Sequence, residues 1–339
     1  MPGAAALIVA LFNMIMVCFL QVKPAACSEL VRPFYTRNMN PFVQIYGLPA
    51  TEGAGLIAEH RLEARFVFDI ANNFTDSVEQ GEGLVIRGET YRSVLAMRYG
   101  IGKKLEIGID LPYVYHGAEN LNDFIREWHN TFGLPQGGRD KAVDDGLAYL
   151  YADGGNNSQV AVAGSTSGIG DVLLAAAIPL WESGEENPRR LTLRASLKLP
   201  TGSASDLQGS GSTDFSLRLC GEDRQSFAAA KISWFGTLGA LLLTDGDVLA
   251  DRQRNAAGFG SVGFGWQPFS RLALQLQLDA NTALYDSALT QLGDFSAQLV
   301  MGGTIGLPRD FQLDLAISED VIVNTAPDAV FHLDLRRMF

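Results

Sequence analysis

Apolar and polar side chains alternate at every second position in segment after segment of this 339-residue chain. In residues 191–199, leucine and alanine hold the odd positions, and Thr192, Arg194, Ser196 and Lys198 hold the even ones. A period of two is that of a β-strand, in which successive side chains point to opposite faces. The same alternation recurs from residue 55 to the end of the chain, so the sequence predicts an all-β fold.

The connections between the expected strands alternate in length. Short ones are expected at residues 100–104, 182–189, 221–225, 267–270 and 307–310, and longer ones at 71–83, 117–167, 200–213, 244–257, 284–293 and 320–328. Outer-membrane barrels have an even number of antiparallel strands, tight periplasmic turns and longer extracellular loops. We therefore predict a transmembrane antiparallel up-and-down β-barrel of about 12 strands, with both termini on the short-turn side.

The direction of the apolar faces also favours a membrane. Each outward apolar side chain would lose roughly 1.5–3 kcal/mol in water, whereas a bilayer stabilises it. An open strand edge in hydrocarbon would leave backbone groups unsatisfied, so the barrel must close. We expect the strand with Glu63 and Arg65 to pair with the last strand, which carries Asp334 and Arg336. Aromatic residues expected at the two membrane interfaces are Tyr99, Tyr113, Tyr115, Trp181, Trp266, Phe269 and Phe339.

The first 54 residues differ from the rest. Residues 4–20 form the only long apolar run, and small residues follow it, which predicts a signal peptide over residues 1–28. A membrane-spanning helix and lipidation of Cys27 are the alternatives. Residues 29–54 contain three prolines and little periodicity, so we expect an extended leader that could lie inside the lumen. The barrel then covers residues 55–339.

The terminal stretch AVFHLDLRRMF, residues 329–339, alternates and ends on Phe339. It resembles the sorting signal of bacterial outer-membrane barrels, although Arg337 stands where that signal usually has an aromatic or apolar residue. This resemblance implies insertion by the barrel-assembly machinery through the last strand. Outer-membrane lipids and lipopolysaccharide are the expected surroundings, and a formal charge of −12 argues against nucleic acid as a partner.

Several stretches resemble the DUF3187 family of bacterial outer-membrane proteins. They are NPFVQIYGLP (40–49), MRYGIGKKLEIGIDLPYV (97–114) and FIREWHNTFGLPQGGR (124–139). GIGDVLLAAAIPL (168–180) and LKLPTGSASDLQGSGSTDFSLRL (197–219) are also similar to a wider group of channel proteins that includes the MetA-type phenol-degradation family. The resemblance implies a β-barrel and an export route, and it implies no particular reaction.

The connection 117–167 contains a predicted amphipathic helix. Apolar residues recur at helical spacing over residues 121–132, and Asn122 or Asp123 could cap the start. We consider a lid over the barrel mouth, a gate or ligand-contacting plug, and a helix on the outer-leaflet surface. The candidate gate or ligand contacts are Phe124, Trp128, His129, Phe132 and Arg139.

Charged residues fall on the strand faces expected to line the lumen. They are Arg61, Glu63, Arg65, Arg92, Arg98, Asp110, Arg194, Lys198, Arg218, Asp334 and Arg336. Either they form a cross-strand ionic network that fills a small barrel, or they line a polar pore. Because both signs are present, the sequence predicts no ion selectivity.

Motifs for catalysis or cofactor binding are weak. A barrel lipase would need a serine beside a histidine, but GSTSG (164–168) places Thr166 at its centre. GFGSVG (258–263) matches the dinucleotide fingerprint, yet it lies in an alternating aromatic segment and opens no helix. Asp245, Asp247 and Asp251 lack a complete calcium-ligand spacing. We therefore predict no enzyme, cofactor or metal site.

These observations favour an outer-membrane barrel that acts as a passive channel or transport protein for small molecules. A structural or surface-interaction barrel without a pore is the alternative, and an outer-membrane lipid-modifying enzyme is the third hypothesis.

Overall fold

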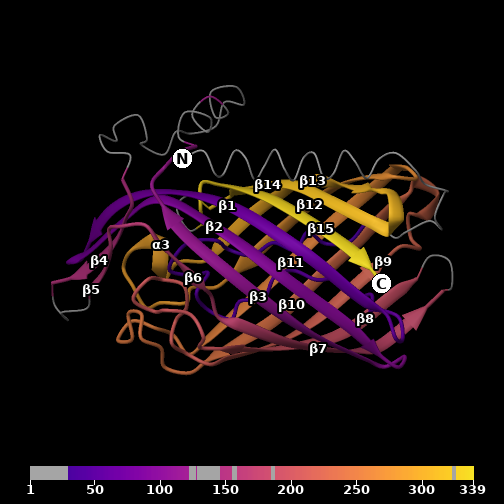
Figure 1. Ribbon diagram of the computed structural model, residues 1–339, viewed down its shortest axis with the longest axis horizontal. Coiled ribbons are helices and arrows are strands. Elements are labelled where there is room, and N and C mark those ends of the chain that lie inside the picture. Colours follow the sequence, from indigo (N-terminus) through magenta and orange to yellow (C-terminus); the bar gives the residue numbers. More distant parts are fainter. Residues whose placement is uncertain (1–29, 122–126, 128–145, 155–158, 185–187, 323–325) are drawn as a thin grey trace.

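Twelve long strands wind around a common axis and close on themselves (Figure 1). The computed structural model describes residues 30–121, 127, 146–154, 159–184, 188–322 and 326–339. The barrel strands are β1 (Leu62–Glu79), β2 (Glu82–Ile101), β3 (Leu105–Gly117), β7 (Val172–Ser183), β8 (Arg189–Leu199), β9 (Asp214–Asp223), β10 (Ile232–Leu243), β11 (Ala256–Phe269), β12 (Leu272–Asn281), β13 (Ser296–Gly306), β14 (Phe311–Asp320) and β15 (Ala329–Met338). The predicted all-β antiparallel barrel of twelve strands is confirmed.

The first and last strands close the barrel. β1 and β15 pair antiparallel from Glu63 opposite Met338 to Asn72 opposite Ala329. The expected pairing of these two strands is therefore confirmed. Closure satisfies the backbone groups that an open edge would expose to hydrocarbon.

Side chains alternate between the outer surface and the lumen. In β1, Phe66 is 39% exposed, whereas the next residue, Val67, is 1% exposed. Large exposed aromatic side chains gather at the end of the barrel with the tight turns, called the tight-turn end below. They are Tyr99, Trp181, Phe227, Trp234, Trp266, Phe269 and Phe339. Such a band is typical of side chains at a membrane interface.

The connection expected at residues 71–83 is not a long loop. β1 and β2 continue through it as a hairpin and are joined only by Gln80 and Gly81. Both residues have positive φ, 50° and 91°, as a two-residue hairpin turn requires. The polar residues Asn72 and Asn73 gave the segment the composition of a loop, but each occupies a paired position in the β1–β2 ladder.

Short strands extend the sheet at the opposite end, called the loop end. β4 (Ala148–Asp153) pairs with the outer part of β2, β5 (Gln159–Val162) pairs with β4, and β6 (Thr166–Ile169) pairs with β3. β4 and β5 fall in the connection predicted at 117–167, and β6 begins in it and ends at Ile169. Most of the helix predicted at 121–132 lies outside the described residues, and so do Phe124, Trp128, His129, Phe132, Arg139 and the predicted signal peptide.

Helices are few and short in the described residues. Those whose whole range is described are α3 (Thr290–Gly293) and the 3-10 turns η3 (Ala228–Ala230) and η4 (Pro308–Asp310), and Glu127 is also helical. Within the described part of the chain, no helix is long and apolar enough to cross a membrane.

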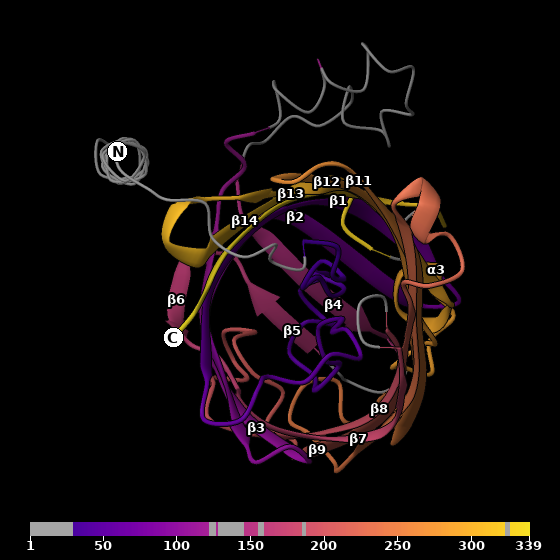
Figure 2. The same cartoon turned by 90° about the vertical axis from the view of Figure 1, so that its right-hand side faces the viewer.

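The N-terminal chain runs inside the ring of strands (Figure 2). It is called the internal segment below and covers residues 30–58. Leu30 and Val31 pack against Ala273 at the tight-turn end, and Phe42 packs against Tyr285 at the loop end. The chain then returns, and Ile57 reaches Glu106 at the start of β3. The internal segment thus starts at the tight-turn end, turns back at the loop end and returns to the tight-turn end.

Candidate functional site

The barrel wall binds the backbone of the internal segment through side chains. The backbone–backbone hydrogen bonds of this segment join its own residues, as in Val43 to Asn40 and Thr51 to Thr36, except at its end, where the Arg61 N–H donates to the Ala58 carbonyl. Side chains of the wall bind its peptide groups at Phe34 (Gln277), Ile45 (Lys198), Gly47 (Asp214), Ala50 (Arg218), Gly53 and Gly55 (Arg194), Ala54 (Thr192) and Ile57 (Glu106). Tyr285, in the connection between β12 and β13, binds the Phe42 carbonyl. The segment is therefore held without becoming a strand of the sheet.

Glu52 of the internal segment meets three wall arginines. Its carboxylate lies 2.9 Å from Arg98 Nε, forms an ion pair with Arg218, and lies 3.8 Å from Arg194 Nη1. Arg194 also pairs with Glu106 at 2.6 Å. All of these side chains are buried. A buried cation without a partner is costly, so Glu52 is an electrostatic anchor of the internal segment.

Lys198 anchors the segment nearer the loop end. Its Nζ lies 2.6 Å from Asp171 and 3.2 Å from Asp214, and it donates to the Ile45 carbonyl at 3.2 Å. It also donates to Ser210 in the connection between β8 and β9. One buried ammonium group thus contacts the barrel wall, the internal segment and the connection between β8 and β9.

A third ionic cluster lies at the barrel seam. Arg65 pairs with Glu63 at 3.0 Å and with Asp334 at 3.1 Å, and Arg336 pairs with Asp314 at 2.5 Å. The ring of Tyr35 lies 4.5 Å from the Arg65 guanidinium carbon. This cation–π contact links Tyr35 of the internal segment to the ion pairs at the seam.

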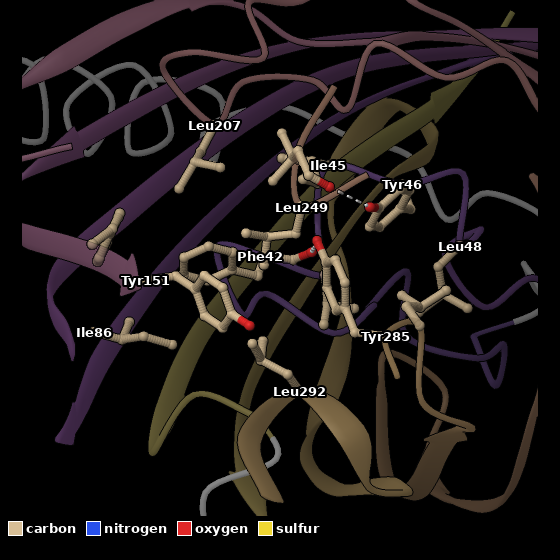
Figure 3. Close-up of a cluster of buried hydrophobic side chains, with 14 of the residues drawn as sticks. Phe42, Ile45, Tyr46, Leu48, Ile86, Tyr151, Leu207, Leu249, Tyr285 and Leu292 are labelled. Carbon is tan, nitrogen blue, oxygen red and sulfur yellow. Dashed lines mark hydrogen bonds between the residues drawn. The ribbon is translucent and has the colours of Figure 1, made fainter. Parts of the chain in front are cut away.

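The loop-end half of the lumen is apolar instead. Figure 3 shows Phe42, Ile45, Tyr46 and Leu48 of the internal segment inside a cluster of wall and loop side chains. The other labelled members are Ile86, Tyr151, Leu207, Leu249, Tyr285 and Leu292. Because these side chains are buried, the cluster seals the loop end as the core of a soluble domain would.

An ionic network ties the connections at the loop end together over this cluster. Arg252 pairs with Asp153 of β4 at 2.5 Å and with Glu82 of β2 at 3.5 Å. Glu82 accepts hydrogen bonds from Ser287 at 2.5 Å and from Tyr151 at 3.0 Å. The hydrogen bond with Asp153 raises the pKa of the Arg252 guanidinium above its ordinary value. The β4–β5 hairpin is therefore fastened to two other connections.

The space left inside the described lumen is small. Three internal cavities have volumes of about 20, 40 and 20 Å³, and residues of the internal segment line all three. A cavity of about 10–15 Å³ is needed to hold one water molecule. Each of these cavities has room for only a few waters. Because residues 30–57 are also mostly buried, the internal segment fills the lumen around them.

Ten of the eleven candidate lumen residues lie inside the barrel and are shielded from solvent. They are Glu63, Arg65, Arg92, Arg98, Asp110, Arg194, Lys198, Arg218, Asp334 and Arg336. Arg61 lies elsewhere: it precedes β1, its side chain is exposed, and it donates to the Phe339 carbonyl at 2.7 Å. Sequence reasoning missed Glu52 and Asp171, because residues in irregular segments have no strand parity that would point them inward. It also missed Asp214, which is the first residue of β9 and shares the parity of Arg218.

Two histidines of the described residues, His332 and His116, and the glycine motif GFGSVG contact structural partners. His332 Nδ1 lies 2.6 Å from Asp69, His116 lies 2.9 Å from Thr90, and His60 is exposed. GFGSVG forms part of β11, where a Cβ at Gly263 would lie 2.4 Å from the Phe235 ring. Two residues further along β11, Gly265 leaves room for Val31 of the internal segment.

A family model described as a protein of unknown function, DUF3187, matches residues 8–339. The chain belongs to the DUF3187 family. A search of curated proteins gives no match. Among solved structures, this DUF3187 protein is similar to the COG4313 outer membrane channel from Pseudomonas putida F1, with 13% identity and a TM-score of 0.55, covering 84% of this chain and 98% of that one. The NanC porin matches with 6% identity and a TM-score of 0.44, covering 82% of this chain and 98% of that one.

The comparison with the first of these structures identifies the fold. At 13% identity, it shows that this DUF3187 protein has the barrel architecture of outer-membrane proteins. The outer membrane is the location that this fold supports. The predicted signal peptide, residues 1–28, lies outside the described residues.

Proposed function

We propose that this DUF3187 protein is an outer-membrane channel for small molecules and that the internal segment is its gate. The observation that carries this proposal is the way the wall holds the segment. Side chains bind it from β3, β8, β9 and β12, but it pairs as a strand with none of them. It can therefore leave the lumen without opening the barrel wall.

Displacement of the internal segment would leave a polar passage at mid-barrel. Arg98, Arg194 and Arg218 would then face Asp110 and Glu106 across water, as in the polar interior of porins. Incoming water would hydrate these charges and offset part of the lost ion pairing. The similarity to a protein described as an outer membrane channel is consistent with this proposal. The helix predicted at 121–132 remains a second candidate for a gate.

Conductance in planar bilayers tests the proposal. Glu52→Gln removes the negative charge that pairs with three buried arginines, so we expect more frequent or longer open events than in wild type. The control is Asp76→Asn, which breaks a partly exposed pair with Arg87 at the loop end. A barrel that stays silent in wild type and in Glu52→Gln would exclude this gate.

A structural or surface-interaction barrel is the second candidate. The small cavities of the described lumen favour it, because they form no open pore in this state. The same bilayer experiment separates the two. If deletion of residues 120–138 also leaves folded Glu52→Gln protein without conductance, the barrel without a pore becomes the better account.

A further inference from the structure

The barrel wall has a notch at its tight-turn end between β3 and β7. The β3–β7 ladder ends where Glu106 pairs with Ala177. β7 continues to Ser183, and over residues 178–183 the pairings of the described strands join it only to β8. Pro179 lies at this edge, beside a register shift in the β7–β8 ladder, and edges and bulges are where proline occurs within sheets.

A cavity of about 510 Å³ opens beside this edge. It is lined by Ala54, Leu56, Ile57, Ala58, Glu59, Gly102, Lys103, Pro179, Trp181, Glu182, Arg190 and Thr192. Pro179 pairs with the buried Thr192, whereas Trp181 lies opposite Leu191 and is 52% exposed. The lining therefore includes residues from both faces of β7, together with the end of the internal segment at Ala54, Leu56 and Ile57.

The notch lies at the level of the lipid headgroups. Trp181 belongs to the aromatic band at the tight-turn end, together with Trp234 and Trp266. Amphipathic rings of this kind lie at the headgroup level of a bilayer. In outer-membrane barrels, the tight turns face the periplasm, so the notch opens toward the periplasmic leaflet.

The lining has an apolar part and a charged part. Leu56, Ile57, Pro179 and Trp181 supply apolar surface, and the charged side chains are two cations and two carboxylates. Arg190 is already paired, with Glu182 at 2.8 Å and with Glu222 at 2.7 Å.

Lys103 and Glu59 are the charges left for a ligand. Lys103 is exposed, and no carboxylate of the described residues lies within 4.0 Å of it. Glu59 contacts only a histidine, His60, at 3.5 Å among the ion pairs of the described chain. Glu59 Oε1 would lie 3.9 Å from a Cβ placed on Gly102, so this carboxylate and the Lys103 backbone share one corner of the notch.

We propose that this notch binds a phospholipid of the periplasmic leaflet whose headgroup carries both a phosphate and an ammonium group. Lys103 binds the phosphate, Glu59 binds the ammonium group, and an acyl chain packs along Pro179 and Trp181. The balance of two cations and two carboxylates disfavours a purely anionic headgroup. This site is independent of whether the barrel conducts.

Lipid retention tests the proposal on the full-length protein. Protein in detergent receives equal amounts of phosphatidylethanolamine and phosphatidylglycerol, and native mass spectrometry measures which lipid stays bound. We expect phosphatidylethanolamine to be retained preferentially, and Lys103→Ala to reduce its retention about fivefold, as one cation near a headgroup contributes. Glu59→Gln should weaken phosphatidylethanolamine retention and abolish the preference over phosphatidylglycerol.

Lys104→Ala is the matched control, because Lys104 is exposed in the same turn but does not line the notch. It should retain lipid as wild type does. Equal losses in Lys103→Ala and Lys104→Ala, equal retention of both lipids by wild type, or no retained lipid would overturn the proposal. Fluorescence quenching by phosphatidylethanolamine with brominated chains locates the lipid: Trp181→Phe should remove most of the quenching, and unchanged quenching would contradict binding in the notch.

Discussion

Gly47 shows at the residue scale how closely the internal segment meets the wall. A Cβ on Gly47 would lie 2.7 Å from Asp214 Cβ and 3.2 Å from Lys198 Cβ, both of which are close to the wall backbone. Its N–H donates to Asp214 at 2.6 Å. No larger residue fits unless the internal segment or the wall moves.

Gly47→Val should therefore displace the internal segment from this contact. Overpacking of this kind costs about 1–3 kcal/mol, so we expect a lower temperature for the heat-induced mobility shift of the folded barrel on a gel. Gly164→Val is the control, because a Cβ on Gly164 meets nothing within 4 Å. If both variants shift at the wild-type temperature, the packing at Gly47 does not contribute to stability.

Lys198 gives a second prediction at this scale. Lys198→Met leaves Asp171 and Asp214 buried without their cation, which should cost about 3–5 kcal/mol in urea unfolding. Adding Asp214→Asn should recover part of this loss. Arg87→Ala, at a partly exposed pair, should cost about 1 kcal/mol or less. Equal losses for Lys198→Met and Arg87→Ala would contradict a buried anchor at Lys198.

Strand parity explains which residues could be predicted. Arg98, Arg194 and Arg218 lie in regular strands, so a period of two was sufficient to assign them to the lumen. Glu52 lies in a segment whose apolar and polar residues do not alternate, and its partners come from three separate strands. Only the closed barrel brings these groups together, so the anchor could not be read from the sequence.

At the scale of elements, the β4–β5 hairpin covers the apolar cluster at the loop end. Tyr149 and Tyr151 of β4 and Val162 of β5 are buried in that cluster. Arg252 fastens the hairpin through Asp153. The hairpin therefore depends on a connection that is 99 residues away in sequence.

Arg252→Ala should loosen this hairpin and leave the barrel strands intact. We expect faster amide hydrogen exchange in residues 148–153 and 159–162, because local opening then costs less free energy. Exchange in β8 and β9 should not change. Unchanged exchange in the hairpin would mean that its apolar contacts alone hold it in place.

Strands with a regular alternation are predicted more accurately than irregular or short ones. Alternation predicts the strands from β7 to β15, because each of them is a regular run of alternating side chains. The hairpin extension of β1 and β2 was missed, since Asn72, Asn73 and Asp76 interrupt the apolar alternation there. β4, β5 and β6 have four to six residues each, too few for a clear period.

At the scale of the whole molecule, closure through β1 and β15 gives a testable contact between the two ends of the barrel. Phe66 lies opposite Leu335. Directly opposite residues of an antiparallel pair have Cβ atoms about 4.5–5.5 Å apart. A short bismaleimide should therefore link Phe66→Cys to Leu335→Cys in the folded protein and change its mobility on a denaturing gel.

The control for this crosslink pairs Phe66→Cys with Leu197→Cys in β8, which is not adjacent to β1 in the sheet. It should not link. Equal linking in both double variants, or none in the first, would contradict closure through these strands.

The central claim is that the internal segment fills the lumen and can be displaced from it. Cys220 of β9 is a native reporter: it is 0% exposed, and it pairs in the sheet with Thr192, which donates to the Ala54 carbonyl of the internal segment. The most direct measurement is the rate at which a small charged thiol reagent modifies Cys220 in folded protein, read by mass spectrometry of the Cys220 peptide. We expect modification of wild type to be at least tenfold slower than of unfolded protein, and markedly faster in Glu52→Gln, while Asp76→Asn behaves as wild type. Rapid modification of folded wild type, or equal slow rates in wild type and Glu52→Gln, would contradict the claim.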